Sequence, residues 1–158
     1  MRFRSDVWLR ARAALDDKGV CYRIVGEGPS LGRLKKLAKD LGIKDRVQFE
    51  GRLEGEAFEE AWASADLFAM LPRREGAGDS EGYGLVFLEA ASRGLAVLGA
   101  ASDGAEEATT LEVDSLQLQD PEDIEAVTVA LRRLRFDPAL RQRLGAAGRL
   151  RFEREGRA

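Results

Sequence analysis

Two glutamates and the glycines between them are the residues whose types and spacing could do chemistry. Glu81 stands before a Gly-Tyr-Gly sequence, which is expected to turn into a helix that carries Glu89. A helix N-terminus has free N–H groups and a positive dipole end, which suit a phosphate. Carboxylates accept hydrogen bonds only, which suits the hydroxyls of a sugar. The pattern is therefore typical of a site for a sugar attached to a phosphate. A buried strand–turn–helix unit whose glutamates face solvent is the simpler alternative, because short glycine motifs are common.

The composition excludes several common kinds of catalytic chemistry. The 158 residues contain no histidine and one cysteine, Cys21. A Ser-His-Asp triad, an intrachain disulfide and the usual zinc ligand sets are therefore excluded. Any chemistry must use carboxylates, arginine, lysine and backbone dipoles. The net charge of −3 gives no general field for nucleic acid, and the basic residues between Arg132 and Arg157 are expected on a solvated helix face.

The length predicts a single domain over residues 1–158, large enough for a sizeable core. No apolar run approaches the ~20 residues that span a membrane, and the N-terminus lacks the apolar stretch of a signal peptide. We therefore expect a cytoplasmic protein without a transmembrane segment.

The hydrophobic pattern alternates between the periods of strands and helices along nearly the whole chain. Short apolar or alternating runs predict strands at 20–25, 46–50, 66–71, 95–99 and 116–118. Helical periodicity predicts helices at 4–16, 30–42, 55–65, 84–93 and 103–110, and two more at the C-terminal end. The strand at 66–71 has no polar alternation, which predicts burial on both faces. Strands separated by amphipathic helices indicate an α/β fold with a Rossmann-like parallel sheet flanked by helices.

Five segments, taken together in their order and spacing, resemble one protein family. They are Tyr22–Pro29, Arg46–Gly51, Ala65–Pro72, Glu81–Glu89 and Gly94–Val97. Over about residues 9–152 the chain is similar to the C-terminal, donor-binding domain of group 1 glycosyltransferases (glycosyltransferase family 4, GT-B fold). The resemblance implies one half of a GT-B fold, a UDP- or GDP-sugar as donor, retention of anomeric configuration, and neither a metal nor another cofactor.

The resemblance also implies roles for particular residues. Glu81 would be the catalytic residue and hydrogen-bond the donor sugar, and Glu89 would bind the ribose hydroxyls. The main-chain amides expected to face the diphosphate and the sugar are those of Gly82, Tyr83, Gly84 and Leu85. The turn expected to contact the nucleobase through its backbone comprises Gly51, Arg52 and Leu53. A second turn that would line the same cleft contains Gly26 and Gly28.

Each of these assignments has a structural alternative. Gly26 and Gly28 could simply form a tight turn with positive φ, Arg52 could be a solvated surface residue, and Tyr83 could pack in the core. Glu89 lies on an otherwise apolar helix. A carboxylate among buried apolar residues is costly unless something pairs with it, so a ligand hydroxyl is expected to serve as its partner.

The chain departs from the family pattern in several places. The family's first strand and the basic loop that neutralises the leaving diphosphate are expected to be absent, and so is the N-terminal acceptor-binding domain. A missing strand beside the 66–71 strand would leave two strand edges unpaired. The chain could close the gap, fill it with residues 1–4, or form a homodimer through that edge. The family's glycine-containing elements at 103–107 and 113–116 are also altered here.

Three functions are therefore open. The first is the donor-binding half of a retaining glycosyltransferase, which transfers a sugar to an unidentified acceptor only when paired with its N-terminal domain. Full-length relatives of this kind would associate peripherally with membranes. The second is a non-catalytic nucleotide-binding or scaffold module. The third is another Rossmann-type enzyme that uses NAD or a nucleoside phosphate. The absence of a strand followed by G-x-G-x-x-G and an acidic ribose anchor argues against it.

Overall fold

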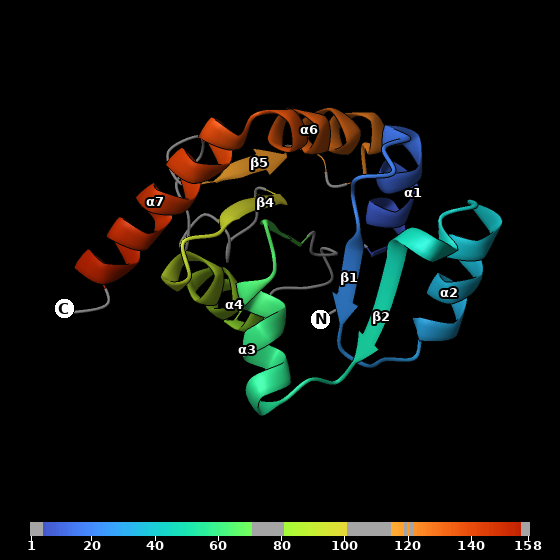
Figure 1. Ribbon diagram of the computed structural model, residues 1–158, viewed down its shortest axis with the longest axis horizontal. Coiled ribbons are helices and arrows are strands. Elements are labelled where there is room, and N and C mark those ends of the chain that lie inside the picture. Colours follow the sequence, from blue (N-terminus) through green and yellow to red (C-terminus); the bar gives the residue numbers. More distant parts are fainter. Residues whose placement is uncertain (1–4, 71–80, 101–114, 119, 121, 156–158) are drawn as a thin grey trace.

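A computed structural model describes the protein over residues 5–70, 81–100, 115–118, 120 and 122–155 (Figure 1). The helices are α1 (Ser5–Leu15), α2 (Leu31–Asp40), α3 (Gly55–Ala63), α4 (Glu81–Ser92), α6 (Ile124–Phe136) and α7 (Pro138–Glu155), with a 3-10 turn η1 (Lys44–Arg46). The strands are β1 (Tyr22–Val25), β2 (Val47–Gly51), β3 (Leu67–Ala69), β4 (Ala96–Ala100) and β5 (Leu116–Leu118). None of the helices described is both long and apolar enough to cross a membrane.

The strands form two parallel sheets. β1 pairs with β2, and the second sheet has the order β3-β4-β5. Both neighbouring pairs in the second sheet are parallel, as is the β1–β2 pair, and parallel pairing requires crossover connections such as helices. This confirms the predicted α/β fold with parallel strands flanked by helices. In the described part of the chain β1, β2, β3 and β5 each have a strand partner on one side only, and β3 is the strand beside which the sequence predicts a missing neighbour.

Helix α1 packs on two hydrophobic cores. Val7, Trp8 and Ala11 belong to the core formed with α6, α7, β4 and β5, whereas Leu9 packs in the core formed with α2 and β2. Tyr22 of β1 contacts both cores, and burial raises the pKa of its hydroxyl. In Figure 1, α1 stands between α6 and α2. Helix α1 therefore ties the two sheets into one unit.

The strand predicted at 66–71 is covered on both faces, as expected, but its burial is incomplete. Leu67 and Ala69 pack against the core that contains β4 and β5, and Phe68 and Met70 pack against the core around Phe87. Leu67, Phe68 and Ala69 of β3 are each only half-buried. Phe68 packs against Trp62 of α3 and Phe87 of α4, with ring centroids 5.3 and 5.6 Å apart. The physical reason is that β3 lies at the edge of its sheet among the described strands, so its apolar side chains are covered from fewer directions than those of β4.

Helix α7 approaches the turn between α4 and β4 so closely that a side chain does not fit. A Cβ atom on Gly145 of α7 would clash with the carbonyl oxygen of Gly94 and lie 2.9 Å from its carbonyl carbon. Both of these contacts are with backbone, which cannot move aside as a flexible side chain can. The missing side chain at Gly145 therefore sets how closely α7 packs on the turn that ends α4.

Gly145→Ala is expected to lower the free energy of unfolding by about 1–3 kcal/mol, since the added methyl overpacks a backbone contact. Gly32→Ala is the matched control, because Gly32 is an exposed position of α2 with open space around it. That change should raise stability by about 0.5–1 kcal/mol through helix propensity. Urea unfolding followed by circular dichroism measures both. Equal effects of the two changes would contradict the close approach of α7.

Candidate functional site

Helix α4 begins earlier than the sequence predicts. Glu81 is its first residue, so residues 82–84 form the first helical turn instead of a turn that precedes the helix. Glycine is a poor helix former by about 1 kcal/mol, but this is a weak preference that its context overrides. The first N–H groups of any helix lack intrahelical partners. The contact predicted between these amides and a diphosphate therefore stays a prediction.

The two predicted glutamates share one helix. Glu81 and Glu89 are eight positions apart on α4, which corresponds to about 12 Å along the axis and a rotation of about 80°. Leu85 lies midway between them in the sequence and is 62% exposed. The side chains of residues 81–84 lie outside the described part of the chain. Positions 81, 85 and 89 thus form one row on the helix, with an exposed apolar side chain in the middle.

The burial predicted for Glu89 is wrong. Its side chain is 45% exposed, although it is surrounded in sequence by apolar residues. The buried face of α4 consists of Phe87, Ala90 and Ala91, at the spacing by which a helix presents one side to a core. Glu89 falls outside that face. A ligand is therefore not needed to compensate for burial, and the carboxylate is open to solvent and to a bound molecule.

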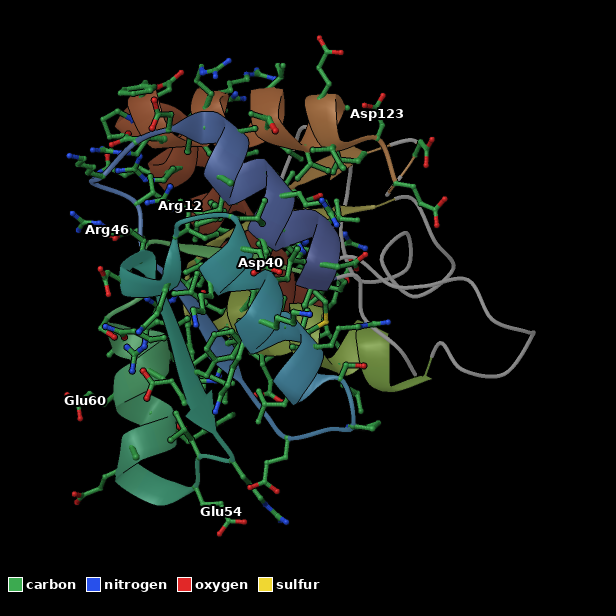
Figure 2. All side chains as sticks on the ribbon, turned by 90° about the vertical axis from the view of Figure 1, so that its right-hand side faces the viewer. Arg12, Asp40, Arg46, Glu54, Glu60 and Asp123 are labelled. Atoms are coloured by element: carbon green, nitrogen blue, oxygen red, sulfur yellow. The ribbon has the colours of Figure 1, made fainter. Side chains whose placement is uncertain are left out.

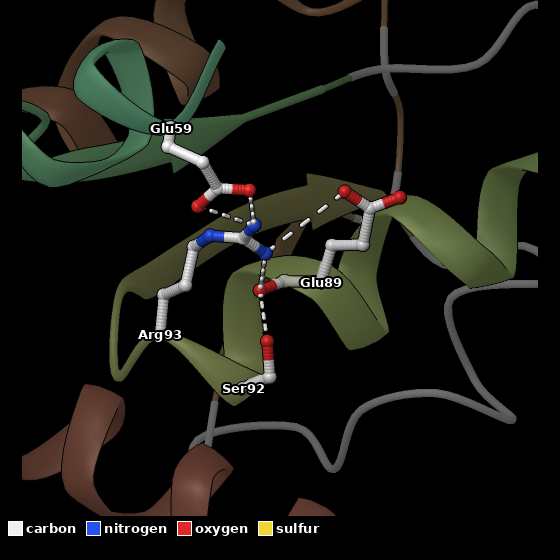
Figure 3. A network of polar contacts seen from close by, with 4 residues as sticks. All are labelled: Glu59, Glu89, Ser92 and Arg93. Atoms are coloured by element: carbon white, nitrogen blue, oxygen red, sulfur yellow. Dashed lines mark hydrogen bonds and ion pairs between the residues drawn. The ribbon is translucent and has the colours of Figure 1, made fainter. Parts of the chain in front are cut away.

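Arg93, one helical turn after Glu89, is a residue that the sequence prediction missed (Figure 3). Its Nη2 donates to both carboxylate oxygens of Glu59 on α3, at 2.9 and 3.0 Å. Its Nη1 donates to the main-chain oxygen of Glu89 at 3.2 Å and lies 4.0 Å from Glu89 Oε2. Its guanidinium also lies over the ring of Trp62, 4.9 Å from the centroid. The i,i+4 spacing of Glu89 and Arg93 is the sequence pattern that could have predicted their contact. No pattern in the sequence predicts the contact between Arg93 and Glu59.

The two predicted glycine turns lie side by side at the ends of β1 and β2. The Gly26 N–H donates to the Gly51 carbonyl at 2.7 Å, and φ is +127° at Gly26 and +66° at Gly51. Glycine is required at both because other residues rarely adopt this conformation. A Cβ added at Gly26, Gly28 or Gly51 would meet no atom within 4 Å. The structure thus brings Gly26 and Gly51 together in open space, where a turn and a ligand-lining surface are both possible.

Arg52 and Leu53 connect the Gly51 turn to α3. Arg52 pairs with Glu54 at 2.9 Å, and both side chains are about three-quarters exposed, at 74% and 73%. Figure 2 shows Glu54 at the outer end of this connection. Such exposed ion pairs contribute little to stability. The Arg52 side chain is therefore a solvated surface residue, which is the alternative considered for it from the sequence. Leu53 is half-buried. The nucleobase contact predicted for this turn is made by the backbone, so it does not depend on the position of the Arg52 side chain.

Several predictions fall outside the described residues. They are the helix at 103–110, the altered glycine-containing element at 103–107, residues 113–114 of the second altered element, and the core alternative for the Tyr83 side chain. What the structure does supply is a helix with an open carboxylate at Glu89, an arginine that ties this helix to α3, and the paired glycine turns just before α3.

Parallel strands with helices between them and glycine turns at the strand ends are the architecture of a Rossmann-like domain, and the GT-B fold of group 1 glycosyltransferases contains two such domains. The family model of glycosyl transferases group 1 matches residues 5–151. The chain belongs to this family, as its resemblance indicated.

A relative with a named activity is the GDP-mannose-dependent alpha-(1-6)-phosphatidylinositol monomannoside mannosyltransferase of Mycolicibacterium smegmatis. It is 41% identical over 127 residues, which cover 80% of this chain and 33% of the relative. The chain spans about a third of the length of this relative and of the corresponding mannosyltransferases of Mycobacterium tuberculosis.

Solved structures share the fold. HepE of Anabaena, in complex with UDP and glucose, has a TM-score of 0.80 at 19% identity, over 96% of this chain and 40% of that one. The C-terminal domain of LpcC, a glycosyl transferase group 1 family protein of Francisella tularensis, has a TM-score of 0.80 at 18% identity, over 96% of this chain and 78% of that domain. At these identities the similarity establishes the fold alone.

Proposed function

We propose that this chain binds the donor of a retaining glycosyltransferase and that the donor is GDP-mannose. The observation that carries this proposal is sequence similarity. Four relatives that are 39–41% identical to the chain are named as GDP-mannose-dependent mannosyltransferases.

In the proposed complex Glu89 accepts hydrogen bonds from the ribose hydroxyls. The half-exposed carboxylate supports this role, because its oxygens are not consumed by a buried partner. Glu81 hydrogen-bonds the sugar and is the catalytic residue. The amides at the start of α4 face the diphosphate, where the helix dipole favours negative charge. The backbone of the Gly51 turn contacts the guanine base, and the Gly26 turn lines the same cleft.

Transfer in this proposal requires an acceptor-binding domain paired with the chain. Such a domain excludes water and places the attacking hydroxyl, which are large contributions to catalysis. The chain by itself is then expected to bind the nucleotide and transfer little or nothing. The acceptor, the independence from metal, the cytoplasmic location and the homodimer through the unpaired strand edge stay predictions.

The experiment that tests the donor is calorimetric titration of the chain with GDP, UDP and ADP. GDP should bind roughly tenfold or more tightly than either of the others, since each further hydrogen bond from guanine to the backbone contributes about 1 kcal/mol. ADP is the matched purine control. UDP binding as tightly as GDP would contradict a GDP-sugar, and no binding of any nucleotide would contradict the donor site itself.

A further inference from the structure

We propose that Arg93 is a positioning residue that holds the Glu89 carboxylate for ribose recognition and fixes it relative to α3. This inference rests on the proposed function of Glu89. It adds two residues, Arg93 and Glu59, to which the proposed function gives no direct contact with the donor.

The environment of Arg93 differs from that of an ordinary surface arginine. Its side chain is 26% exposed, one flat face lies over Trp62, and its two terminal nitrogens contact different helices. Stacking on an aromatic ring and pairing with a carboxylate restrict a guanidinium to one orientation. Trp62 is itself held, because its ring packs against Phe58 and Phe68 with centroids 6.1 and 5.3 Å apart. Arg93 is therefore a fixed cation next to Glu89.

The contact between Arg93 and the Glu89 carboxylate is electrostatic and leaves hydrogen-bonding capacity free. The separation of Nη1 from Oε2 is 4.0 Å, beyond the length of a hydrogen bond. The main-chain oxygen of Glu89 accepts from Arg93 at 3.2 Å and from Ser92 Oγ at 2.7 Å. The carboxylate is thus attracted toward the cation while its lone pairs stay available to hydroxyl donors (Figure 3).

Arg93 also links the two parts of the proposed donor site. Glu59 belongs to α3, which begins at Gly55, four residues after Gly51. The pair between Arg93 and Glu59 therefore connects the helix that carries the ribose ligand to the helix that follows the nucleobase turn. Binding-site side chains that are held in position before the nucleotide binds lose less conformational freedom when the complex forms. Loss of Arg93 should impair recognition of the ribose hydroxyls in particular.

The test compares the affinity of GDP with that of 2′,3′-dideoxy-GDP, by calorimetry, in the chain and its variants. The unaltered chain should bind the dideoxy compound roughly 10- to 100-fold more weakly, because hydrogen bonds to a charged acceptor are lost. Arg93→Met should reduce this ratio to about threefold or less while thermal unfolding stays cooperative. Arg149→Met is the matched control, since Arg149 forms an i,i+4 pair with Glu153 on the exposed face of α7, and it should leave the ratio unchanged.

Glu59→Gln provides a second variant that keeps Trp62, Arg93 and Glu89 in place. It removes the charge that anchors Arg93 on α3, and the ratio should fall to an intermediate value. If Arg93→Met and Glu59→Gln weaken both nucleotides equally and the ratio persists, Arg93 is only a structural tie and the inference is overturned. If the unaltered chain binds GDP without discriminating against the dideoxy compound, the ribose role of Glu89 fails as well. If the unaltered chain binds no GDP, that result contradicts the proposed function itself and not only the role of Arg93.

Discussion

Glu89→Ala is expected to weaken GDP binding to the chain roughly 10- to 100-fold. The proposed hydrogen bonds run from ribose hydroxyls to a charged carboxylate, and such bonds contribute about 1.5–3 kcal/mol. The half-exposed position of Glu89 means that removing it leaves no cavity in the core. The fold should therefore survive the change. Isothermal titration with GDP measures the loss directly.

Glu60→Ala is the control for this substitution. Glu60 is an exposed glutamate on α3, and Figure 2 shows its side chain directed away from the molecule. The Glu60→Ala variant should bind GDP with the affinity of the unaltered chain. Glu89→Gln keeps the shape of the side chain and one acceptor oxygen, so an intermediate affinity is expected. GDP binding by Glu89→Ala within about twofold of the unaltered chain would remove Glu89 from the proposed site.

Glu81→Gln is expected to lower the rate of transfer roughly 10²- to 10³-fold while GDP affinity changes by less than about threefold. Positive charge develops on the donor sugar as the glycosidic bond breaks, and hydrogen bonds to a sugar hydroxyl strengthen in that transition state by several kcal/mol. GDP lacks the sugar, so the affinity of the chain for GDP should not depend on this substitution. The effect belongs to kcat and not to nucleotide binding.

The assay combines the chain with the N-terminal part of the Mycolicibacterium smegmatis relative, using GDP-mannose and the acceptor in that relative's name, phosphatidylinositol monomannoside. Glu56→Gln, at an exposed position near the start of α3, is the control and should transfer at the unaltered rate. Equal rates for the Glu81 variant and the unaltered chain would contradict the catalytic role. Tight GDP binding without transfer in any combination would favour the non-catalytic nucleotide-binding module.

The sequence by itself determined the order and type of the elements. Apolar alternation and helical periodicity are local properties, so they predicted every strand that the structure describes, including β5 at residues 116–118. The positive φ considered for the Gly26–Gly28 turn also follows from local chemistry, and it is found at Gly26 but not at Gly28. The family was recognisable for the same reason, because its motifs are short segments in a fixed order.

Only the tertiary structure decided which side chains are exposed and which meet. Glu89 lies within an apolar run, yet it falls outside the face of α4 that meets the core. Edge position, and not composition, left β3 half-buried. Arg93 and Glu59 are 34 residues apart in the chain, and their contact depends on how α3 and α4 pack around Trp62. Packing of distant elements is a global property, and no local pattern of residues encodes it.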